Sequence, residues 1–263
     1  MVELISRVSK GTRMDQIYIP KNRQALPAGS YVVVKLLEAE KKEAKPIFYD
    51  LSSLEPIKTE IIHNIIKTVE QHINNENIII TGSFLDRRFR FNDIDVLLIV
   101  KERTNISSVQ QILENKTGAK IHLVQIKNKE LIKGLSTDPL YRVMLSRCVS
   151  KVRFIHKVKR EINYRLLDLH LLRSKPLMDS FDFLTGYEKY EMVRNLVAIR
   201  QFIDKKEVSK QAVDTIINNL FGSIDKLKNN LISKKDFLKK YKKIYSNTEN
   251  NIMEGVKNEP KQK

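Results

Sequence analysis

Residues 78–100 read IIITGSFLDRRFRFNDIDVLLIV, and this stretch decides the fold. An apolar run ends at Gly82 and Ser83, a charged loop with aromatic residues follows, and Asp93 and Asp95 open a second apolar run. Side chains alternate between the two faces of a strand, so both carboxylates project from one face, with Cα atoms roughly 7 Å apart. The other face carries apolar side chains that helices are expected to cover: Ile94, Val96, Leu98 and Val100.

Two neighbouring carboxylates repel each other unless a positive charge lies between them. A divalent metal ion supplies that charge, and Mg²⁺ typically binds one or two carboxylates together with substrate phosphates. Gly82 and Ser83, at a strand-to-helix turn, offer backbone N–H groups and a hydroxyl to a phosphate. Each feature alone is also typical of an ordinary turn or of a cap before a strand. Together they predict a site that holds a nucleoside triphosphate between the Gly-Ser turn and a metal ion.

The flanking sequence predicts a mixed α/β core over residues 51–157. Apolar residues at three- and four-residue spacing predict a helix from Pro56, and a further helix is expected at residues 106–116 after Asn105. Strands are expected at 77–81, 94–100 and 120–126, followed by a helix at 137–147 and a short closing strand at 151–155. The expected fold is a mixed sheet with helices.

The segment GSFLDRRFRFNDID (82–95) resembles the polymerase-β-like nucleotidyltransferase superfamily, especially its minimal nucleotidyltransferases. The resemblance covers about residues 56–157 and ends in STDPLYRVMLSRCVSKVRFI, a helix followed by a short strand. It implies transfer of a nucleoside monophosphate from a nucleoside triphosphate to a hydroxyl, with release of pyrophosphate. Asp93 and Asp95 would hold Mg²⁺ or Mn²⁺. The loop lacks the family's usual Arg-Gly pair, and Arg87, Arg88 and Arg90 are the nearest cations. They could contact the triphosphate or nucleic acid, with Arg87 and Arg88 as the candidate nucleotide-binding residues, or they could belong to an ordinary solvent-exposed loop.

The family usually carries a third carboxylate on the next strand, which here reads KIHLVQI and has His122 at that position. A neutral imidazole can act as a base or as a softer metal ligand. The same histidine could mark a site that binds nucleotides without efficient turnover. It could also be an ordinary polar residue of an edge strand.

Residues 1–50 are predicted to form a small β module. The strands QIYIP and SYVVVKLLE are separated by the turn sequence LPAG. The segment is similar to the AbrB-type swapped-hairpin domain, which implies an intertwined homodimer that binds DNA. The candidate DNA-binding residues are Arg13, Lys21 and Arg23. The alternative is a module that only dimerises or packs on the catalytic part.

The chain has 48 Lys and Arg against 31 Asp and Glu, a formal net charge of +17. Such an excess attracts polyanions, which include DNA, RNA and triphosphates, although a lysine-rich surface also serves solubility. A basic run between residues 151 and 175 suits nucleic acid and includes Lys157, Lys159 and Arg160. The later segment SKKDFLKKYKKIY (233–245) interleaves lysines with aromatic residues. It predicts either a phosphate-binding surface or a solvated amphipathic helix.

The remaining chain is predicted to be a helical domain over residues 158–245, with helices at 159–173, 187–204 and 209–231. A polar tail at 246–263 is predicted to be disordered. No segment approaches the roughly 18 apolar residues of a membrane span. With Cys148 as the single cysteine, no internal disulfide is possible. A cytoplasmic protein is expected.

Two functions remain open from the sequence. The first is a metal-dependent nucleotidyltransferase acting on RNA, plausibly tRNA, or on a protein hydroxyl. It is favoured by the intact Gly82, Ser83, Asp93 and Asp95. The second is a non-catalytic DNA- or RNA-binding protein that uses the nucleotidyltransferase fold as a scaffold. That reading is favoured by His122 and by the net charge.

Overall fold

The computed structural model describes residues 45–87, 89, 91–154 and 158–258, and near the N-terminus residues 6, 8–19, 21, 27 and 29–34. The chain divides into two compact units, Met1–Glu43 and Ala44–Lys263. The sequence predicted a boundary near residue 50, but strand β3 (Ile47–Tyr49) pairs with β7 (Cys148–Ser150) in the second unit. The N-terminal module therefore ends before β3. The core and helical regions, predicted as separate domains, lie together in the second unit.

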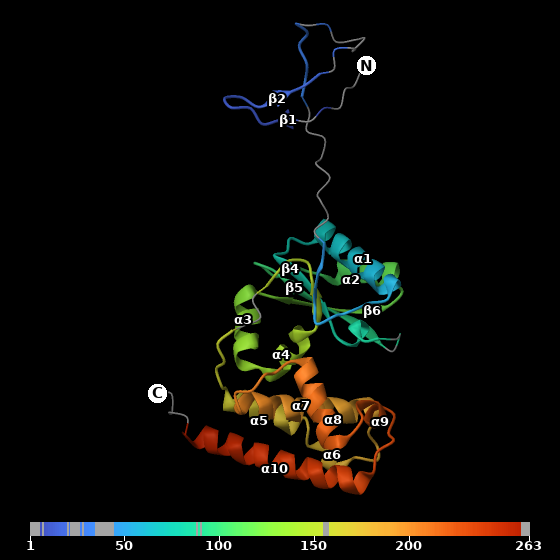
Figure 1. Ribbon diagram of the computed structural model, residues 1–263, viewed down its shortest axis with the longest axis vertical. Coiled ribbons are helices and arrows are strands. Elements are labelled where there is room, and N and C mark those ends of the chain that lie inside the picture. Colours follow the sequence, from blue (N-terminus) through green and yellow to red (C-terminus); the bar gives the residue numbers. More distant parts are fainter. Residues whose placement is uncertain are drawn as a thin grey trace. The chain divides into compact units, whose positions relative to one another are not determined.

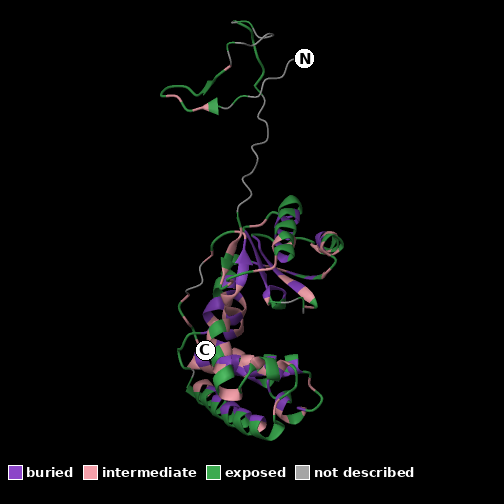
Figure 2. Cartoon of the chain, turned by 45° about the vertical axis from the view of Figure 1, so that its right-hand side comes forward, coloured by how far each residue is buried: buried purple, intermediate pink, exposed green. Residues whose placement is uncertain are grey.

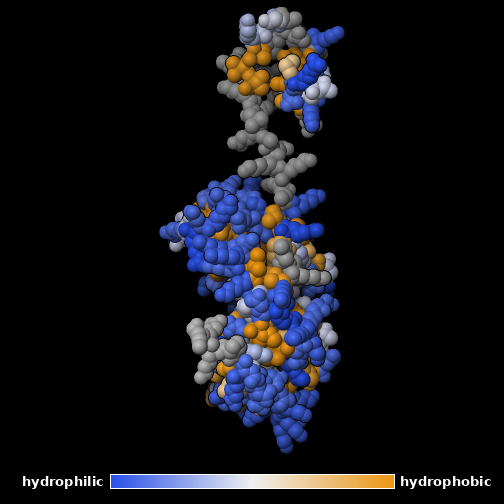
Figure 3. All heavy atoms as spheres, turned by 90° about the vertical axis from the view of Figure 1, so that its left-hand side faces the viewer, coloured by the Kyte–Doolittle hydropathy of each residue, from blue (hydrophilic) through white to orange (hydrophobic). Residues whose placement is uncertain are grey.

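The described part of the N-terminal unit contains one short antiparallel ladder. Strand β1 (Val8–Ser9) pairs with β2 (Gln16–Ile17), and β2 lies within the predicted strand QIYIP. The second predicted strand is not formed over its described residues, because 31–34 have no regular structure. Their side chains are exposed, with Tyr31 at 104% and Val33 at 85%, and hydrophobic side chains are visible on this unit in Figure 3. Strands β1 and β2 are too short to provide an apolar face that could cover the exposed side chains of residues 31–34.

The second unit is built on a five-stranded mixed sheet in the order β3-β7-β4-β5-β6, which confirms the predicted α/β class (Figure 1). Strand β4 (Asn77–Thr81) is antiparallel to both β5 (Asp93–Ile99) and β7. Strand β6 (Lys120–Ile126) runs parallel to β5 and forms one edge of the sheet. The closing strand was predicted at 151–155 but lies at 148–150. Cys148 and Val149 are fully buried in this strand, whereas Lys151 directly after it reaches outward to pair with Glu70 at 2.7 Å.

Helices cover both faces of the sheet, whose strands are largely buried (Figure 2). Helices α1 (Pro56–His72) and α2 (Ser107–Thr117) pack on one face through an apolar cluster that includes Ile65, Val96 and Leu113. Helices α3 (Asn128–Thr137) and α4 (Pro139–Ser146) pack on the other face through Leu97, Leu131 and their neighbours. Helix α3 was not predicted from the sequence. It buries Leu131 and Leu135, one helical turn apart.

The rest of the described chain is helical and packs on α4. It contains α5 (Tyr164–Leu172), α6 (Pro176–Asp179), α7 (Gly186–Ile203), α8 (Lys210–Phe221), α9 (Ile224–Lys228) and α10 (Lys234–Asn258). The long helix predicted at 209–231 is divided between α8 and α9 at Gly222, whose φ of 87° interrupts a helix. Helix α4 contacts both α7 and α8, and these contacts join the helical region to the sheet. No described helix is both long enough and apolar enough to span a membrane.

Helix α10 corrects the prediction of a disordered tail from residue 246, because it continues to Asn258. Its second half packs on the helical core, where Ile252 is fully buried. Gly255 lies so close to the ring of Tyr164 on α5 that a Cβ there would overlap the ring. The sequence prediction missed this part of the helix, because the tail is polar overall and only one face of it, which includes Ile252, is buried. Residues 259–263 lie outside the described chain.

We expect Ile252→Ala to lower the free energy of unfolding by about 2–5 kcal/mol, because it opens a cavity in the helical core. The control is Met253→Ala on the same helix, whose side chain is 49% exposed and whose loss should change stability by no more than about 0.5 kcal/mol. Urea unfolding followed by circular dichroism measures both. Equal stabilities for the two variants would show that this half of α10 does not pack as described.

Candidate functional site

The two carboxylates lie at the start of β5 and share one face of the sheet, as the sequence predicted. Ile94, the residue between them, packs with α1 and α2 on the other face. On the carboxylate side, Leu97 and Ile99 further along β5 belong to the apolar cluster under α3 and α4. Asp93 and Asp95, at the start of the strand, are only half-buried. They remain within reach of solvent and of a bound ion.

Gly82 is in direct contact with Asp95, one of the two carboxylates. Asp95 lies opposite Thr81 in the β4–β5 ladder, so the carboxylate reaches the residue that follows β4. Gly82 has a φ of 88° and a ψ of −166°, a region of backbone conformation that is essentially restricted to glycine. A Cβ at this position would overlap Oδ2 of Asp95. The glycine is thus required both by its backbone conformation and by the approach of the carboxylate.

Ser83 opens a single 3₁₀ turn, η1 (Ser83–Leu85), and its side chain is exposed. The amide of Leu85 donates to the carbonyl of Gly82 at 3.3 Å, and the amide of Asp86 donates to the carbonyl of Ser83 at 3.0 Å. Phe84 and Leu85 are buried and anchor the turn. The hydroxyl of Ser83 therefore lies on the solvent side of a fixed turn.

His122 is placed beside Asp95 by the parallel pairing of β5 and β6. Its Nδ1 lies 3.1 Å from Oδ1 of Asp95, and 64% of its side chain is exposed. The tautomer decides whether Nδ1 donates to the carboxylate. When it does, Nε2 is the ring nitrogen that can accept a proton. The structure thus brings together the carboxylates, the imidazole and the glycine that the sequence singled out.

The donor set suits a divalent metal only in part. Asp93 and Asp95 provide the carboxylate oxygens that Mg²⁺ and Mn²⁺ prefer, and Mg²⁺ commonly completes its shell with water and substrate phosphates. Among the described residues, no group of three or more His, Cys, Asp and Glu side chains is arranged to hold a metal ion. A metal at this site would therefore depend on oxygens from the substrate.

The cationic candidates of the loop are only partly described. Arg87 is exposed on the loop after η1. Arg88 and Arg90 lie outside the described residues. The loop is held by a different cation, Lys58 of α1, which sequence reasoning missed. Its ammonium donates to the carbonyl of Asp86 at 2.6 Å, pairs with Glu55 at 3.1 Å and lies 5.1 Å from the centre of the Phe89 ring.

Lys58 could have been recognised from the sequence. It is four residues before Ile62, on the stripe of α1 that packs on the sheet, and its side chain is fully buried. A lysine on the apolar stripe of a helix is rarely buried unless it has a partner. The signal was present, but it did not identify Asp86 as that partner.

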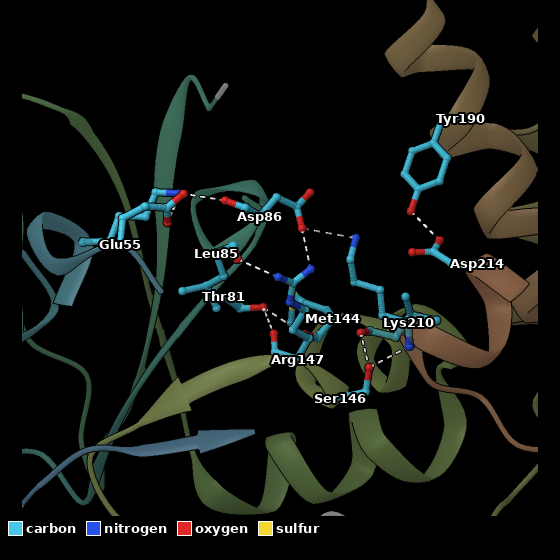
Figure 4. A network of polar contacts seen from close by, with 12 residues as sticks. Glu55, Thr81, Leu85, Asp86, Met144, Ser146, Arg147, Tyr190, Lys210 and Asp214 are labelled. Carbon is cyan, nitrogen blue, oxygen red and sulfur yellow. Dashed lines mark hydrogen bonds and ion pairs between the residues drawn. The ribbon is translucent and has the colours of Figure 1, made fainter. Parts of the chain in front are cut away.

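Asp86 also meets two cations that arrive from other elements (Figure 4). Arg147, directly after α4, donates from Nη1 to Oδ1 of Asp86 and from Nη2 to the carbonyl of Leu85, both at 2.8 Å. Lys210, the first residue of α8, places its ammonium 3.6 Å from the same Oδ1. Asp86 therefore links the end of the Gly-Ser turn to α4 and to the helical region.

The candidate nucleic-acid residues have separate outcomes. Arg13 and Lys21 in the N-terminal unit and Lys159 in the second unit are exposed, whereas Arg23 and Lys157 lie outside the described residues. Arg160 remains a predicted nucleic-acid contact, but its side chain is also used within the protein. Its guanidinium donates to the carbonyls of Phe202 at 2.8 Å and Lys206 at 2.6 Å. It is therefore used to tie the chain before α5 to the end of α7.

The lysine-rich helix α10 divides into two sides. The aromatic residues predicted to be interleaved with its lysines are buried in the helical core: Phe237, Tyr241 and Tyr245. They cannot stack with the bases of a nucleic acid while the helix is packed. The lysines project from the other side and are exposed: Lys234, Lys235, Lys239, Lys240, Lys242 and Lys243. This side is a cationic surface, on which Lys234 pairs with Asp182 and lies 5.9 Å from the centre of the Phe181 ring.

We expect Gly82→Ala to destabilise the protein more than Gly222→Ala. Both glycines have similar backbone angles, at which alanine costs about 1–3 kcal/mol. A Cβ at Gly222 meets nothing within 4 Å. At Gly82 it also displaces the carboxylate of Asp95, an overpacking that adds about 1–3 kcal/mol. Denaturant titration of the two variants measures the difference, and equal losses would contradict the close contact between Gly82 and Asp95.

Three neighbouring strands therefore define the arrangement: β4, which Gly82 follows, β5 with Asp93 and Asp95, and β6 with His122. It places two carboxylates beside an imidazole and an exposed serine. Comparison with known proteins adds no relative to this description, because no family model, no curated protein and no solved structure matches the chain.

Proposed function

We propose that the chain is a metal-dependent nucleotidyltransferase. The observation that carries this proposal is the contact of Gly82 with Asp95, with Asp93 on the same face and His122 at 3.1 Å from Asp95. Two negative carboxylates on one face of a strand repel each other unless a positive charge lies between them. A half-exposed pair next to a glycine turn is therefore explained best by a cationic ligand with an anionic partner.

The residues would divide the work as follows. Asp93 and Asp95 would hold Mg²⁺ or Mn²⁺, which neutralises charge on the triphosphate and on the leaving pyrophosphate. The Ser83 hydroxyl would donate to a phosphate oxygen. An acceptor hydroxyl forms a bond to the α-phosphorus, and the bond from that phosphorus to the oxygen bridging the β-phosphate breaks. His122 would take the acceptor proton on Nε2 while Nδ1 donates to Asp95.

The acceptor proposed is a hydroxyl of RNA, such as tRNA. A protein hydroxyl is the alternative acceptor for the same reaction. The net charge of +17 supports a polyanionic acceptor. The exposed lysines of α10 and the exposed Lys159 support contacts to a phosphate backbone. These contacts would be independent of sequence, because lysine bound to phosphate carries no base information.

We expect the double variant Asp93→Asn/Asp95→Asn to lose metal-dependent nucleotide binding, because asparagine keeps the shape but removes both negative charges. Titration calorimetry with Mg²⁺ and each common nucleoside triphosphate measures the binding, and label transfer to total RNA measures the activity. Glu102→Gln, which neutralises an exposed carboxylate three residues beyond the other end of β5, is the control and should behave as wild type. Unchanged Mg²⁺–nucleotide binding in the double variant would refute the site.

A second candidate function is supported by one observation, the imidazole at the position of a third carboxylate. His122 brings no fixed negative charge, so the site binds a metal less strongly than three carboxylates would. On this alternative the chain binds nucleic acid through its basic surface and uses the same fold without transfer chemistry. His122 is then a polar residue of an edge strand.

His122 variants separate the two functions. For the enzyme, His122→Ala should lower the transfer rate by about 10²–10⁴, as expected for a lost general base. His122→Asp should restore or raise Mg²⁺-dependent transfer, and wild type should prefer Mn²⁺. His63→Ala, on an exposed face of α1, is the control. Equal transfer rates in wild type and His122→Ala would remove the histidine from the mechanism.

A further inference from the structure

Asp86 is the point at which the Gly-Ser turn meets the helical region. Its carboxylate accepts from Arg147 at 2.8 Å and lies 3.6 Å from the ammonium of Lys210, and its carbonyl accepts from Lys58 at 2.6 Å. The three cations come from three different elements: α1, the segment after α4, and α8. All three are mostly or fully buried, and Asp86 itself is only 30% exposed.

Lys210 is in an unfavourable position for a lysine. It is the first residue of α8, and the positive end of the helix dipole repels a cation there. Burial also lowers its pKa, while Asp86 and then Asp214 oppose that change. Its own amide donates to Oγ of Ser146 at 2.8 Å, so the start of α8 is fastened to the end of α4. The carboxylate of Asp86 at 3.6 Å offsets this cost, and the Tyr190 ring lies 5.8 Å from the ammonium.

The turn that carries Ser83 is attached to α4 on both sides. Before it, Oγ1 of Thr81 donates to the carbonyls of Met144 at 2.8 Å and Arg147 at 3.2 Å (Figure 4). After it, Arg147 holds the carbonyl of Leu85 and the carboxylate of Asp86. The amide of Asp86 in turn donates to the carbonyl of Ser83. A displacement of Asp86 is therefore passed to Ser83 through one hydrogen bond.

We propose that Asp86 and Lys210 are positioning residues, through which the docked helical region holds the Ser83 hydroxyl in place for a triphosphate. The inference rests on the proposed function, because it gives a task to the same turn. Lys210 does not touch the substrate on this view. It acts through Asp86, and its charge matters more than its length.

Loss of this charge should weaken nucleotide use. In the full-length protein, Lys210→Met should lower kcat/KM for transfer by up to about 10²-fold, the cost of a misplaced binding group, mainly through a higher KM for the nucleotide. Lys210→Arg, which keeps the charge, should recover most of the loss. The control Lys226→Met removes an exposed lysine of α9 and should leave transfer unchanged. Equal KM values for wild type and Lys210→Met would overturn the inference.

A second measurement does not depend on activity. Hydrogen exchange of the Leu85 and Asp86 amides should lose protection in Lys210→Met and keep it in Lys210→Arg, with global stability compared by thermal unfolding. Asp86→Asn should show the same local loss of protection. It replaces Lys210→Met in the experiment if that variant does not fold. Wild type that transfers no label would refute the proposed function alone, whereas unchanged exchange in these variants would refute this inference alone.

Discussion

The register of β4 against β5 is the constraint on which the rest of the site depends. It places Asp95 opposite Thr81, so the carboxylate meets Gly82 at the end of β4, and the neighbouring ladder places His122 beside it. A slip of one residue would turn both aspartates toward α1 and α2. They would then be buried among apolar side chains without a partner, which is costly for a charge. Burial of the apolar face therefore fixes the geometry of the polar one.

Buried cations hold the other end of the turn. Lys58 and Lys210 reach Asp86 from opposite sides of the structure, one through its carbonyl and one through its carboxylate. Removing one member of a buried charged group is more damaging than replacing the whole group, because a charge is left without a partner. Tyr190 extends the same region: it donates to Asp214 at 2.7 Å, and burial raises its pKa above the ordinary value. The interface between sheet and helices is thus organised by charge as well as by apolar packing.

The positive charge of the chain consequently serves two purposes. Part of it is internal, since Lys58, Arg147, Arg160 and Lys210 pair with carbonyls or carboxylates of the second unit. The charge of these residues is used within the protein. Other cations are exposed: they line one side of α10, whose aromatic residues are in the core, and they also occur elsewhere, for example at Arg87 and Lys159. The net charge therefore overstates the positive charge that is available to nucleic acid. Only the structure shows which cations are not used in internal pairs.

Local patterns in the sequence determined the mixed sheet, helix α1 and strand β4. They also placed the Gly82-Ser83 turn and the two aspartates of β5 in one site. Strand alternation and helical spacing were sufficient for this, because they indicate which face of an element is buried. These patterns did not determine which residues from other parts of the chain pack against a given face. The roles of Lys58 and Lys210, the structural use of Arg160 and the continuation of α10 through Ile252 all depend on partners far away in the chain. Only the tertiary structure decided them, since a charge or a single apolar stripe is stabilised by its neighbours in space.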